Sequence, residues 1–435
     1  MKKLFLLLTV SLFMSATFAQ TGHMMQGIGA FNMSMGGAAT GHSLDINGAL
    51  QWNSAAISKF DKTIITLDVG LMFSSPTLYS TVPTPNGPMS GSTESELGPS
   101  PLPSLAIVFG KEDSKHTFGV SIFGVSGFGV DFPQSSTNPI NFPQNQGGFG
   151  HVKSSYMLMQ VGLTYAYEIS DKLSVGVEPI FNYEILQIEP NPLTSPSMQL
   201  GYPNSESAGA TGFGGQIGLY YGGDDGFKAG ISYKTEQFFG EYTFTNTYLD
   251  GTSAPDNSFT MNFPAIFSVG AGYSKELFDI AIDYRRVFYS STEGFEASGW
   301  TIAANGMPDG SVAGFGWQDI NVISAGVQLK LIEFMPIRLG YTYSSNPIDP
   351  DLTMYSISAP AIIEQAFQIG LGLNISDRLV INATYHHGMS NDKTSGKLLN
   401  PMMISPTNPR GEILGSEVAF DMTTNLFILG ASYSF

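Results

Sequence analysis

The feature that most constrains this fold is a regular series of segments in which apolar and polar residues alternate, beginning at Thr63 and continuing to the last residue. A period of two residues is typical of strands with one face in an apolar environment. The pattern predicts fourteen strands, at residues 63–75, 103–110, 117–130, 156–168, 173–189, 212–222, 227–244, 262–273, 278–290, 318–331, 335–345, 364–374, 378–388 and 425–435.

The connections between these segments alternate in length. Six are short turns, and they alternate with seven connections of about 15 to 35 residues that are rich in Pro, Ser, Asn and Gly. Outer-membrane barrels have short periplasmic turns and long extracellular loops, and an even strand number places both barrel ends on the short-turn side. The sequence therefore predicts an all-β, 14-stranded antiparallel transmembrane β-barrel.

The alternation also predicts which residues face lipid. In residues 278–286 the apolar set opposes a polar set that includes Asp283 and Arg285, and Arg338 has the polar parity in its own strand. The apolar sets should face lipid, because a charge at the bilayer midplane costs about 2–4 kcal/mol. The last strand alternates up to Phe435, and such a terminal aromatic residue resembles the signal read by the barrel assembly machinery. An edge strand of a soluble β-sandwich fits the long loops and few charges poorly.

Residues 1–19 have the features of a secretory signal peptide, with Lys2 and Lys3 before an apolar run and small residues before Gln20. No later segment is apolar for long enough to form a transmembrane helix. Charged residues make up only 13%, against about 25% in a typical soluble domain. There is no cysteine, and the net charge of −17 disfavours nucleic acid as a partner. The predicted location is the outer membrane of a Gram-negative bacterium.

Residues 27–60 are neither a good strand nor a good helix. Six glycines and many small apolar residues between positions 27 and 60 suit a segment packed inside a larger structure. The predicted organisation is a signal peptide at 1–19, an N-terminal hatch that plugs the lumen at 20–60, and a barrel at 61–435.

The hatch sequence carries a family resemblance. The run GGAATG, a turn containing Asp45 and the run ALQWNSAAIS resemble the hatch of FadL-type long-chain fatty acid transporters, and residues 124–132, 263–287 and 317–348 resemble later parts of that family. Two positions depart from it. Ser54, in Asn53-Ser54-Ala55, replaces the proline of the family's Asn-Pro-Ala, and Phe31-Asn32 stand where many members have a basic residue.

The resemblance implies outer-membrane transport of long-chain fatty acids or similar hydrophobic compounds by a monomer surrounded by lipid and lipopolysaccharide. It implies ligand capture among the extracellular loops, a pocket above the hatch and lateral exit at a kinked third strand. That strand contains Gly124, Gly127 and Gly129, and glycine inside a strand often marks a bulge. Alternatively, these glycines only make room for the hatch.

The carboxylate headgroup of a fatty acid would favour a cationic side chain as its binding partner. Arg285 and Arg338 are the candidates, because arginine can hold a carboxylate with two hydrogen bonds. The alternative is that they pair with inward-facing acids such as Asp283. His386 and His387 point to opposite faces of a strand, so they do not form a metal site together. With no G-x-S-x-G motif, the sequence predicts no enzyme, cofactor or metal. A general diffusion porin and a loop-mediated adhesin are the competing functions, and a lipid hydrolase is a more distant one.

Overall fold

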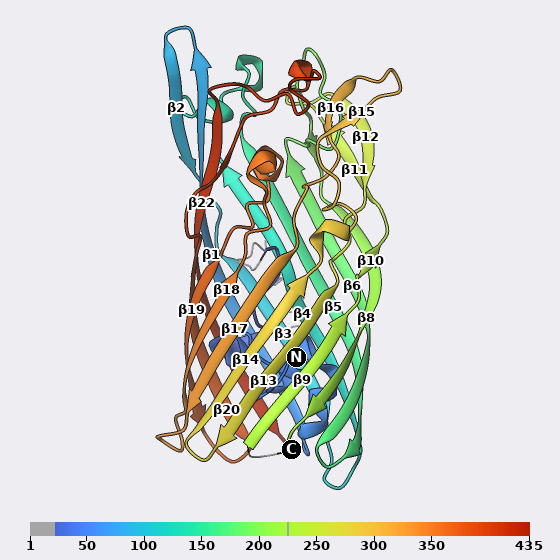
Figure 1. Cartoon of the computed structure of the whole chain (residues 1–435), viewed down its shortest axis with the longest axis vertical. Coiled ribbons are helices and arrows are strands. Elements are labelled where there is room, and N and C mark those ends of the chain that lie inside the picture. The colour runs from blue at the N-terminus through green and yellow to red at the C-terminus, as the bar shows by residue number, and fades with distance from the viewer. Residues whose placement is uncertain (1–21, 224–225) are drawn as a thin grey trace, which may run out of the picture.

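The computed structural model describes residues 22–223 and 226–435, and in these residues fourteen strands close into an antiparallel cylinder (Figure 1). The signal peptide predicted at 1–19 lies outside the described residues. The wall strands, in order, are β1 (Thr63–Thr84), β3 (Ser100–Phe109), β4 (His116–Phe132), β5 (Val152–Ser170), β6 (Leu173–Glu189), β8 (Ala208–Tyr221), β9 (Gly226–Lys234), β13 (Ile266–Lys275), β14 (Phe278–Val287), β17 (Ile320–Leu329), β18 (Ile337–Ser344), β19 (Gln365–Asn374), β20 (Leu379–Met389) and β22 (Glu417–Ser434).

The cylinder closes where the first wall strand pairs with the last, from Ile64 opposite Ser434 to Thr81 opposite Glu417. The short turns and the C-terminus lie at one end of the cylinder, and the long connections lie at the other (Figure 1). Closure pairs the first and last wall strands with each other, so neither leaves a free sheet edge in lipid. The predicted fold class and strand number are confirmed.

The largest differences from the predicted lengths are in three wall strands. β1 and β22 are longer than predicted because they continue to pair with each other above the barrel, where β1 also pairs with β2 (Gly87–Glu94). The strand predicted at 227–244 is too long, because the wall strand ends at Lys234. The chain then forms β10 (Phe238–Phe239) and β11 (Tyr242–Thr247). Aromatic residues continue the alternation across this break, so the sequence pattern did not reveal it.

The remaining short elements belong to the connections between wall strands. They are β7 (Asn204–Ser205), β12 (Ser253–Phe259), β15 (Trp300–Ile302), β16 (Pro308–Val312), β21 (Thr394–Gly396), η3 (Pro139–Asn141), η4 (Gln144–Gln146), η5 (Tyr289–Ser291), η6 (Pro350–Ser356) and η7 (Pro401–Met403).

The outer face of the barrel is apolar, as the alternation predicts. Ile282 and Leu429 are 51% and 66% exposed, while Asp283 and Arg285 on the opposite face of β14 are 1% exposed. In a bilayer the exposed apolar side chains contact lipid, so this face stabilises the barrel in the membrane.

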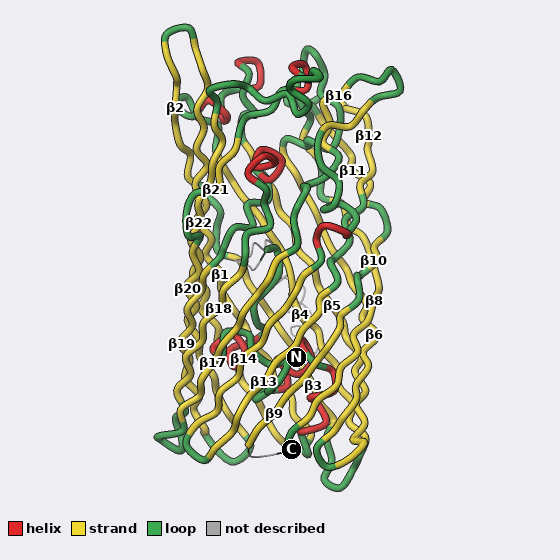
Figure 2. The backbone as a smooth tube through the Cα atoms, in the orientation of Figure 1, coloured by secondary structure: helices red, strands yellow, loops and turns green. Residues whose placement is uncertain are grey.

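The hatch lies inside the cylinder, in its lower half (Figure 2). It consists of α2 (Gly29–Ser34), α3 (Ile46–Trp52) and η2 (Ser54–Lys59), and nearly all of their residues are buried. No helix among the described residues is long and apolar enough to cross a membrane. The sequence prediction of a lumen-filling hatch is confirmed.

Glycines on the lumen side of the wall allow the hatch backbone to approach closely. Gly326 and Gly340 lie opposite each other on β17 and β18. A Cβ atom on Gly326 would lie 2.4 Å from the Met35 carbonyl oxygen, and one on Gly340 would lie 2.3 Å from the Gly36 nitrogen. Larger residues at these wall positions would push the hatch backbone away. The glycines that alternate with outward apolar residues in these strands thus form the contact surface for the hatch.

We expect Gly340→Val to loosen the hatch, because the new side chain overlaps the backbone at Gly36 rather than a flexible side chain. Overpacking of this kind costs about 1–3 kcal/mol. The purified variant should unfold at a lower temperature, measured by the heat-induced mobility shift of the barrel on a gel. Gly124→Ala is the control, since a Cβ atom there meets no atom within 4 Å. Equal melting temperatures for both variants would contradict the prediction.

The motif Asn53-Ser54-Ala55 connects α3 to η2. The Asn53 side-chain oxygen accepts from the Ala55 N–H at 3.1 Å, and its amide donates to the carbonyl oxygens of Thr40 at 2.8 Å and of Leu219 in β8 at 3.0 Å. Asn53 therefore caps η2 and ties the hatch to the wall. The Ser54 hydroxyl is buried without a hydrogen-bond partner among the described residues.

We expect Ser54→Pro to stabilise the protein. Ser54 is the first residue of η2, where proline is favoured, and Asn53 before it is extended at φ −156° and ψ 97°. Proline at a compatible position adds about 0.4–1 kcal/mol. In the same assay Ser54→Pro should melt at a higher temperature than the wild type. Ser54→Ala is the control, because it removes only the hydroxyl. A proline variant that melts below the alanine variant would show that the backbone here does not accept the ring.

Candidate functional site

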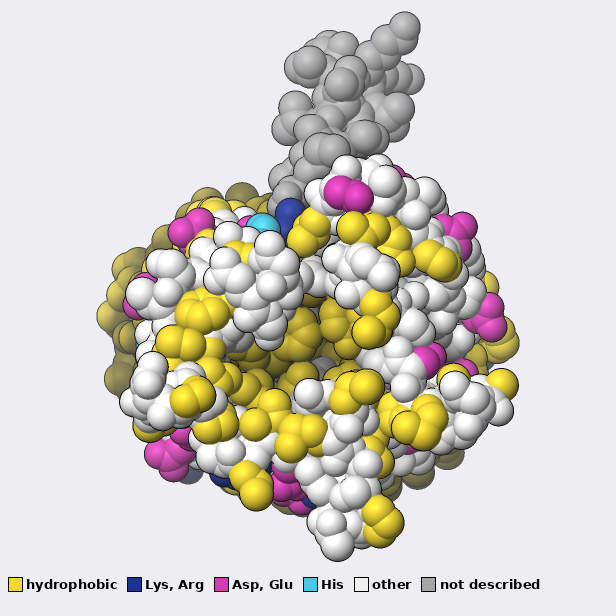
Figure 3. All heavy atoms as spheres, turned by 90° about the horizontal axis from the view of Figure 1, so that it is seen from above, with side chains coloured by type: hydrophobic (Ala, Val, Ile, Leu, Met, Phe, Trp, Pro, Cys, Tyr) yellow, Lys and Arg dark blue, Asp and Glu magenta, His cyan; other side chains and the backbone are white. Residues whose placement is uncertain are grey.

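An apolar hollow opens at the loop end of the barrel. Figure 3 shows hydrophobic side chains gathered around a central depression on this face. The Trp300 and Tyr355 rings meet edge to face with centroids 5.5 Å apart, and those of Phe149 and Tyr202 lie 6.0 Å apart. These four rings, with Pro190 and other apolar residues, line the hollow. An aromatic surface of this kind binds apolar molecules by excluding water from both partners.

The loop that follows η6 connects this hollow to the lumen. Residues 359–363 are apolar and buried. The loop is fixed to the wall where the Ser154 hydroxyl of β5 donates to the Ser358 carbonyl oxygen at 2.5 Å. Ser358 also lines the hollow, so the same loop forms part of the hollow and part of the lumen lining below it.

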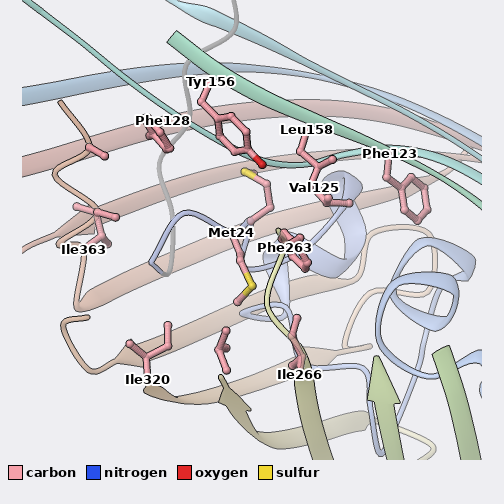
Figure 4. Close-up of a cluster of buried hydrophobic side chains, with 14 of the residues drawn as sticks. Met24, Phe123, Val125, Phe128, Tyr156, Leu158, Phe263, Ile266, Ile320 and Ile363 are labelled. Carbon is pink, nitrogen blue, oxygen red and sulfur yellow. The ribbon is translucent and has the colours of Figure 1, made fainter. Parts of the chain in front are cut away.

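Below this loop lies a cluster of buried apolar side chains centred on the first described residues of the hatch. Figure 4 shows Met24 surrounded by side chains from several elements of the wall and loops. These include Phe123, Val125, Phe128, Tyr156, Leu158, Phe263, Ile266, Ile320 and Ile363. The cluster gives the lumen an apolar region above the hatch helices.

His23 contributes a neutral ring to this cluster. It is fully buried, its Nδ1 lies 2.7 Å from the Tyr289 hydroxyl, and its ring centroid is 4.9 Å from that of Phe295 and 5.9 Å from that of Trp317. Burial lowers the pKa of His23 to about 3. The imidazole is therefore uncharged at neutral pH and adds no positive charge to the cluster.

The third wall strand, β4, has an irregular middle. Its register with β5 shifts between Gly124 and Ser126, so Val125 is the extra residue of a β-bulge. Its pairing with β3 ends at Phe123, opposite Ser104. Beyond this point β4 and β3 have no further register pairs among the described residues. The third wall strand thus has a β-bulge at the place where β3 and β4 separate, and the kinked lateral exit predicted for this strand stays a prediction.

Residues 23–25, the tip of the hatch, lie against the edge of β4 beside the bulge, where β3 no longer pairs with it. The Met25 N–H donates to the Val125 carbonyl oxygen at 2.9 Å, and the Gly127 N–H donates to the His23 carbonyl oxygen at 3.1 Å. Met24 and Ser126 form an isolated antiparallel bridge. Because β5 occupies one edge of β4, these bonds use its other edge. Two backbone groups that β3 leaves unpaired, the Val125 carbonyl and the Gly127 N–H, are thus satisfied by the hatch.

The glycines predicted for the lateral gate have different surroundings. Gly124 adjoins the bulge, and a Cβ atom there would meet nothing within 4 Å. Gly127 donates to the hatch tip, and Gly129 lies opposite Ser155 in β5. Gly119, lower in the strand, has the other expected role, because a Cβ atom there would lie 2.6 Å from the Leu50 Cδ2 atom of the hatch. The gate function of the first three stays a prediction.

Arg285 is buried at the contact between wall and hatch. Its guanidinium donates to the Asp283 carboxylate at 2.8 Å and to the Gly37 carbonyl oxygen at 2.5 Å, and lies 3.7 Å from the centroid of the Trp52 ring. Asp283 also accepts from three consecutive backbone N–H groups, of residues 39–41, at 2.7, 2.7 and 3.2 Å. The sequence analysis offers Asp283 as a partner for Arg285, but nothing in the sequence indicates that Asp283 also binds the hatch backbone.

Arg338 is likewise buried. It donates to Gln328 at 2.8 Å and to Asn382 at 2.9 Å, and its guanidinium lies 3.5 Å from the centroid of the Phe31 ring in the hatch. The headgroup role predicted for Arg285 and Arg338 stays a prediction, and the contacts of both arginines are with the hatch and the adjacent wall.

A second carboxylate also binds the hatch, and sequence reasoning missed it. Asp68 of β1 accepts from the Ala30 N–H at 2.8 Å and from the Asn47 amide at 2.7 Å. In the sequence, Asp68 stands out only as the single charged residue of its strand. Among the described residues, no group of three or more His, Asp or Glu is placed to hold a metal ion.

Comparisons with known proteins agree with this architecture. The Pseudomonas putida toluene transporter TodX aligns over 96% of this chain and all of its own, with a TM-score of 0.67 and 18% identity. A Pseudomonas aeruginosa FadL homologue aligns over 95% and 100%, with a TM-score of 0.70 and 16% identity. The Ralstonia pickettii toluene transporter TbuX aligns over 94% and 99%, with a TM-score of 0.63 and 16% identity. At these identities the likeness shows the fold alone. No curated protein matches the sequence.

The family model described as "Outer membrane protein transport protein (OMPP1/FadL/TodX)" matches residues 9–435, which is nearly the whole chain. Members of this family are transport channels for hydrophobic compounds rather than enzymes, and they lie in the outer membrane of Gram-negative bacteria. This chain therefore belongs to the OMPP1/FadL/TodX family of outer membrane transport proteins.

Proposed function

We propose that this protein carries long-chain fatty acids or similar hydrophobic small molecules through the outer membrane and releases them sideways between β3 and β4. The observation that supports this best is the bulged edge of β4, which β3 leaves and the hatch tip covers. A wall gap closed by a separate segment can open without breaking the pairing of the rest of the barrel.

Capture in this proposal begins at the aromatic hollow among the loops. Burial of each methylene is worth up to about 0.8 kcal/mol, so a chain of about ten carbons gains several kcal/mol even after its ordering cost. The hollow and the cluster around Met24 are linked by the inward loop at residues 357–363. A hydrophobic molecule can therefore exchange one apolar surface for the next without passing through water.

The firm contact between hatch and wall supports lateral rather than axial release. Asp68 holds one hatch backbone N–H group and the Asn47 amide, Asp283 holds three backbone N–H groups, and Lys59 at the end of η2 pairs with Glu168 of β5 at 2.8 Å. Axial passage would need these contacts to break together. Lateral release needs only the hydrogen bonds of the hatch tip to yield.

The competing functions fit the structure less well. A general diffusion porin needs a continuous water path, whereas the hatch helices are buried against the wall from α2 to η2. An adhesin needs neither a hatch nor an apolar lumen. The single chain closes its own barrel, which supports a monomer. We also propose that the barrel assembly machinery reads the aromatic terminus at Phe435, and that lipopolysaccharide surrounds the outer rim.

We expect Gly124→Phe to block transport. Gly124 has the outward parity of Ile122, and a Cβ atom there meets nothing within 4 Å. A bulky ring at this position can therefore cover the outer mouth of the proposed exit without displacing the backbone. The variant should fold and bind ligand, while uptake of a radiolabelled long-chain fatty acid by cells falls at least about tenfold, a barrier of about 1.4 kcal/mol.

Gly223→Phe is the matched control for this test. A Cβ atom at Gly223 also meets nothing within 4 Å, but the residue lies between β8 and β9 at the short-turn end of the barrel. Its uptake should equal that of the wild type. Undiminished uptake by Gly124→Phe would remove the exit between β3 and β4 from the proposal.

We expect Asp283→Ala to make the barrel leaky. The substitution leaves three hatch N–H groups and the Arg285 guanidinium without their carboxylate, and loss of one partner of a buried ion pair costs about 3–5 kcal/mol. Ion conductance in planar bilayers should rise above that of the wild type. Asp319→Ala is the control, because Asp319 pairs with the partly exposed Arg286 away from the hatch. Unchanged conductance in Asp283→Ala would show that this carboxylate does not hold the hatch in place.

A further inference from the structure

The two ends of the barrel differ in charge. In the seven long connections Asp and Glu outnumber Lys and Arg by 16 to 3, over residues 85–99, 133–151, 190–207, 235–265, 288–319, 345–364 and 390–416. In the six short turns they outnumber them by 8 to 5, over residues 110–115, 171–172, 222–225, 276–277, 330–336 and 375–378. Charge of one sign around an opening raises the local concentration of ligands of the opposite sign. The loop end therefore attracts cations and repels carboxylates.

The aromatic hollow opens at this acidic end. Phe149, Tyr202, Trp300 and Tyr355 all line it, and its described lining residues include no lysine or arginine. The planes of the Trp300 and Tyr355 rings are 83° apart. The face of an aromatic ring is negative, and several rings around one hollow are typical of sites that bind quaternary ammonium groups. The hollow thus combines an apolar surface with rings that attract a cation.

An acid without a basic partner lies beside the hollow. The Tyr202 hydroxyl donates to the Gly310 carbonyl oxygen at 2.5 Å, which places the preceding residue, Asp309, next to the lining. The Asp309 carboxylate accepts from the N–H and the hydroxyl of Ser311 at 2.8 and 2.7 Å. Among the described residues it forms no ion pair. Its negative charge is therefore not cancelled by a neighbouring lysine or arginine.

The basic residues near the hollow have acids beside them. Arg410 pairs with Asp351 of η6 at 2.5 Å and lies 3.8 Å from Glu412. Lys153, which follows the lining residue Val152, is opposite Glu189 in the register of β5 and β6. Acid thus matches base at both positions, and Asp309 makes the surroundings of the hollow negative on balance.

We propose that the aromatic hollow recognises amphiphilic cations, in which an alkyl chain carries a trimethylammonium or similar ammonium group. The ammonium group lies against the rings of Trp300 and Tyr355, and the alkyl chain follows the loop at residues 357–363 toward the lumen. This assignment rests on the proposed function, since it names the class of hydrophobic molecule that the entrance prefers. A fatty acid anion enters by the same route against the charge of the loops.

The test compares octyltrimethylammonium, 1-octanol and octanoate, which share one alkyl chain and differ in charge. Isothermal titration calorimetry measures their binding to the purified protein in one nonionic detergent at low salt. We expect octyltrimethylammonium to bind about tenfold more tightly than 1-octanol, because the rings attract its ammonium group. Octanoate should bind least tightly of the three, because the loops repel its carboxylate.

Trp300→Leu separates the attraction of the ring from burial of the chain. The variant keeps an apolar side chain in the hollow, so its affinity for 1-octanol should stay close to that of the wild type. Its affinity for octyltrimethylammonium should fall to that for 1-octanol. Phe213→Leu is the matched control, because Phe213 is an aromatic residue on the lipid face of β8, 66% exposed. That variant should keep the wild-type preference.

Asp309→Asn separates the contribution of charge. Asparagine keeps an oxygen for Ser311, and the ratio of octyltrimethylammonium to octanoate affinity should fall about threefold, as loss of one charge several Å away predicts. Asp250→Asn is the matched control. Asp250 lies in the turn between β11 and β12 and accepts from the N–H and hydroxyl of Thr252 in the same manner. Its variant should keep the wild-type ratio.

The possible results separate this inference from the proposed function. Equal binding of octyltrimethylammonium and 1-octanol by the wild type, or tightest binding of octanoate, would overturn the cation site and leave hydrophobic transport standing. A wild-type preference for the cation in Trp300→Leu would also overturn it. Absence of binding by all three probes would instead contradict capture at the hollow, which belongs to the proposed function itself.

Discussion

The hatch can fill the barrel only because the lumen wall accepts a polypeptide backbone at van der Waals distance. Glycines such as Gly326 and Gly340 remove side chains where the hatch passes, and two buried carboxylates, Asp68 and Asp283, supply acceptors for its N–H groups. A segment of short helices and turns has many backbone groups that its own structure does not satisfy. The wall satisfies them, so the hatch does not need a continuous helix or sheet of its own.

The sequence predicted the barrel well because the membrane makes two demands that leave a local signal. Each strand must alternate, and each connection must be short or long according to the side it faces. The exposed apolar residues of β14 and β22 follow that alternation. Outside the membrane these two requirements no longer apply, and there the predicted strand ends were wrong. Above the membrane β1 and β22 continue, and the aromatic run after Lys234 breaks into short strands whose alternation serves loop packing instead.

The site was harder to predict, because its contacts join residues far apart in the chain. Parity placed Arg285 and Arg338 in the lumen correctly, but it could not say that Trp52 and Phe31 of the hatch would cover them. The glycines of β4 could mark an irregular strand or make room for the hatch, and the structure contains glycines in both surroundings. Gly119 adjoins Leu50 of the hatch, and Gly124 adjoins a bulge.

The position of the hatch tip links these features. Its backbone bonds to the open edge of β4, and the side chains of His23 and Met24 lie in the apolar cluster above the hatch helices. In the transport path that we propose, a molecule entering this cluster would compete with these side chains for the same apolar surface. Displacing them would withdraw the hydrogen bonds between the hatch and β4. The hatch helices would stay bound to Asp68 and Asp283, so the proposed exit would open while the axial path remained closed.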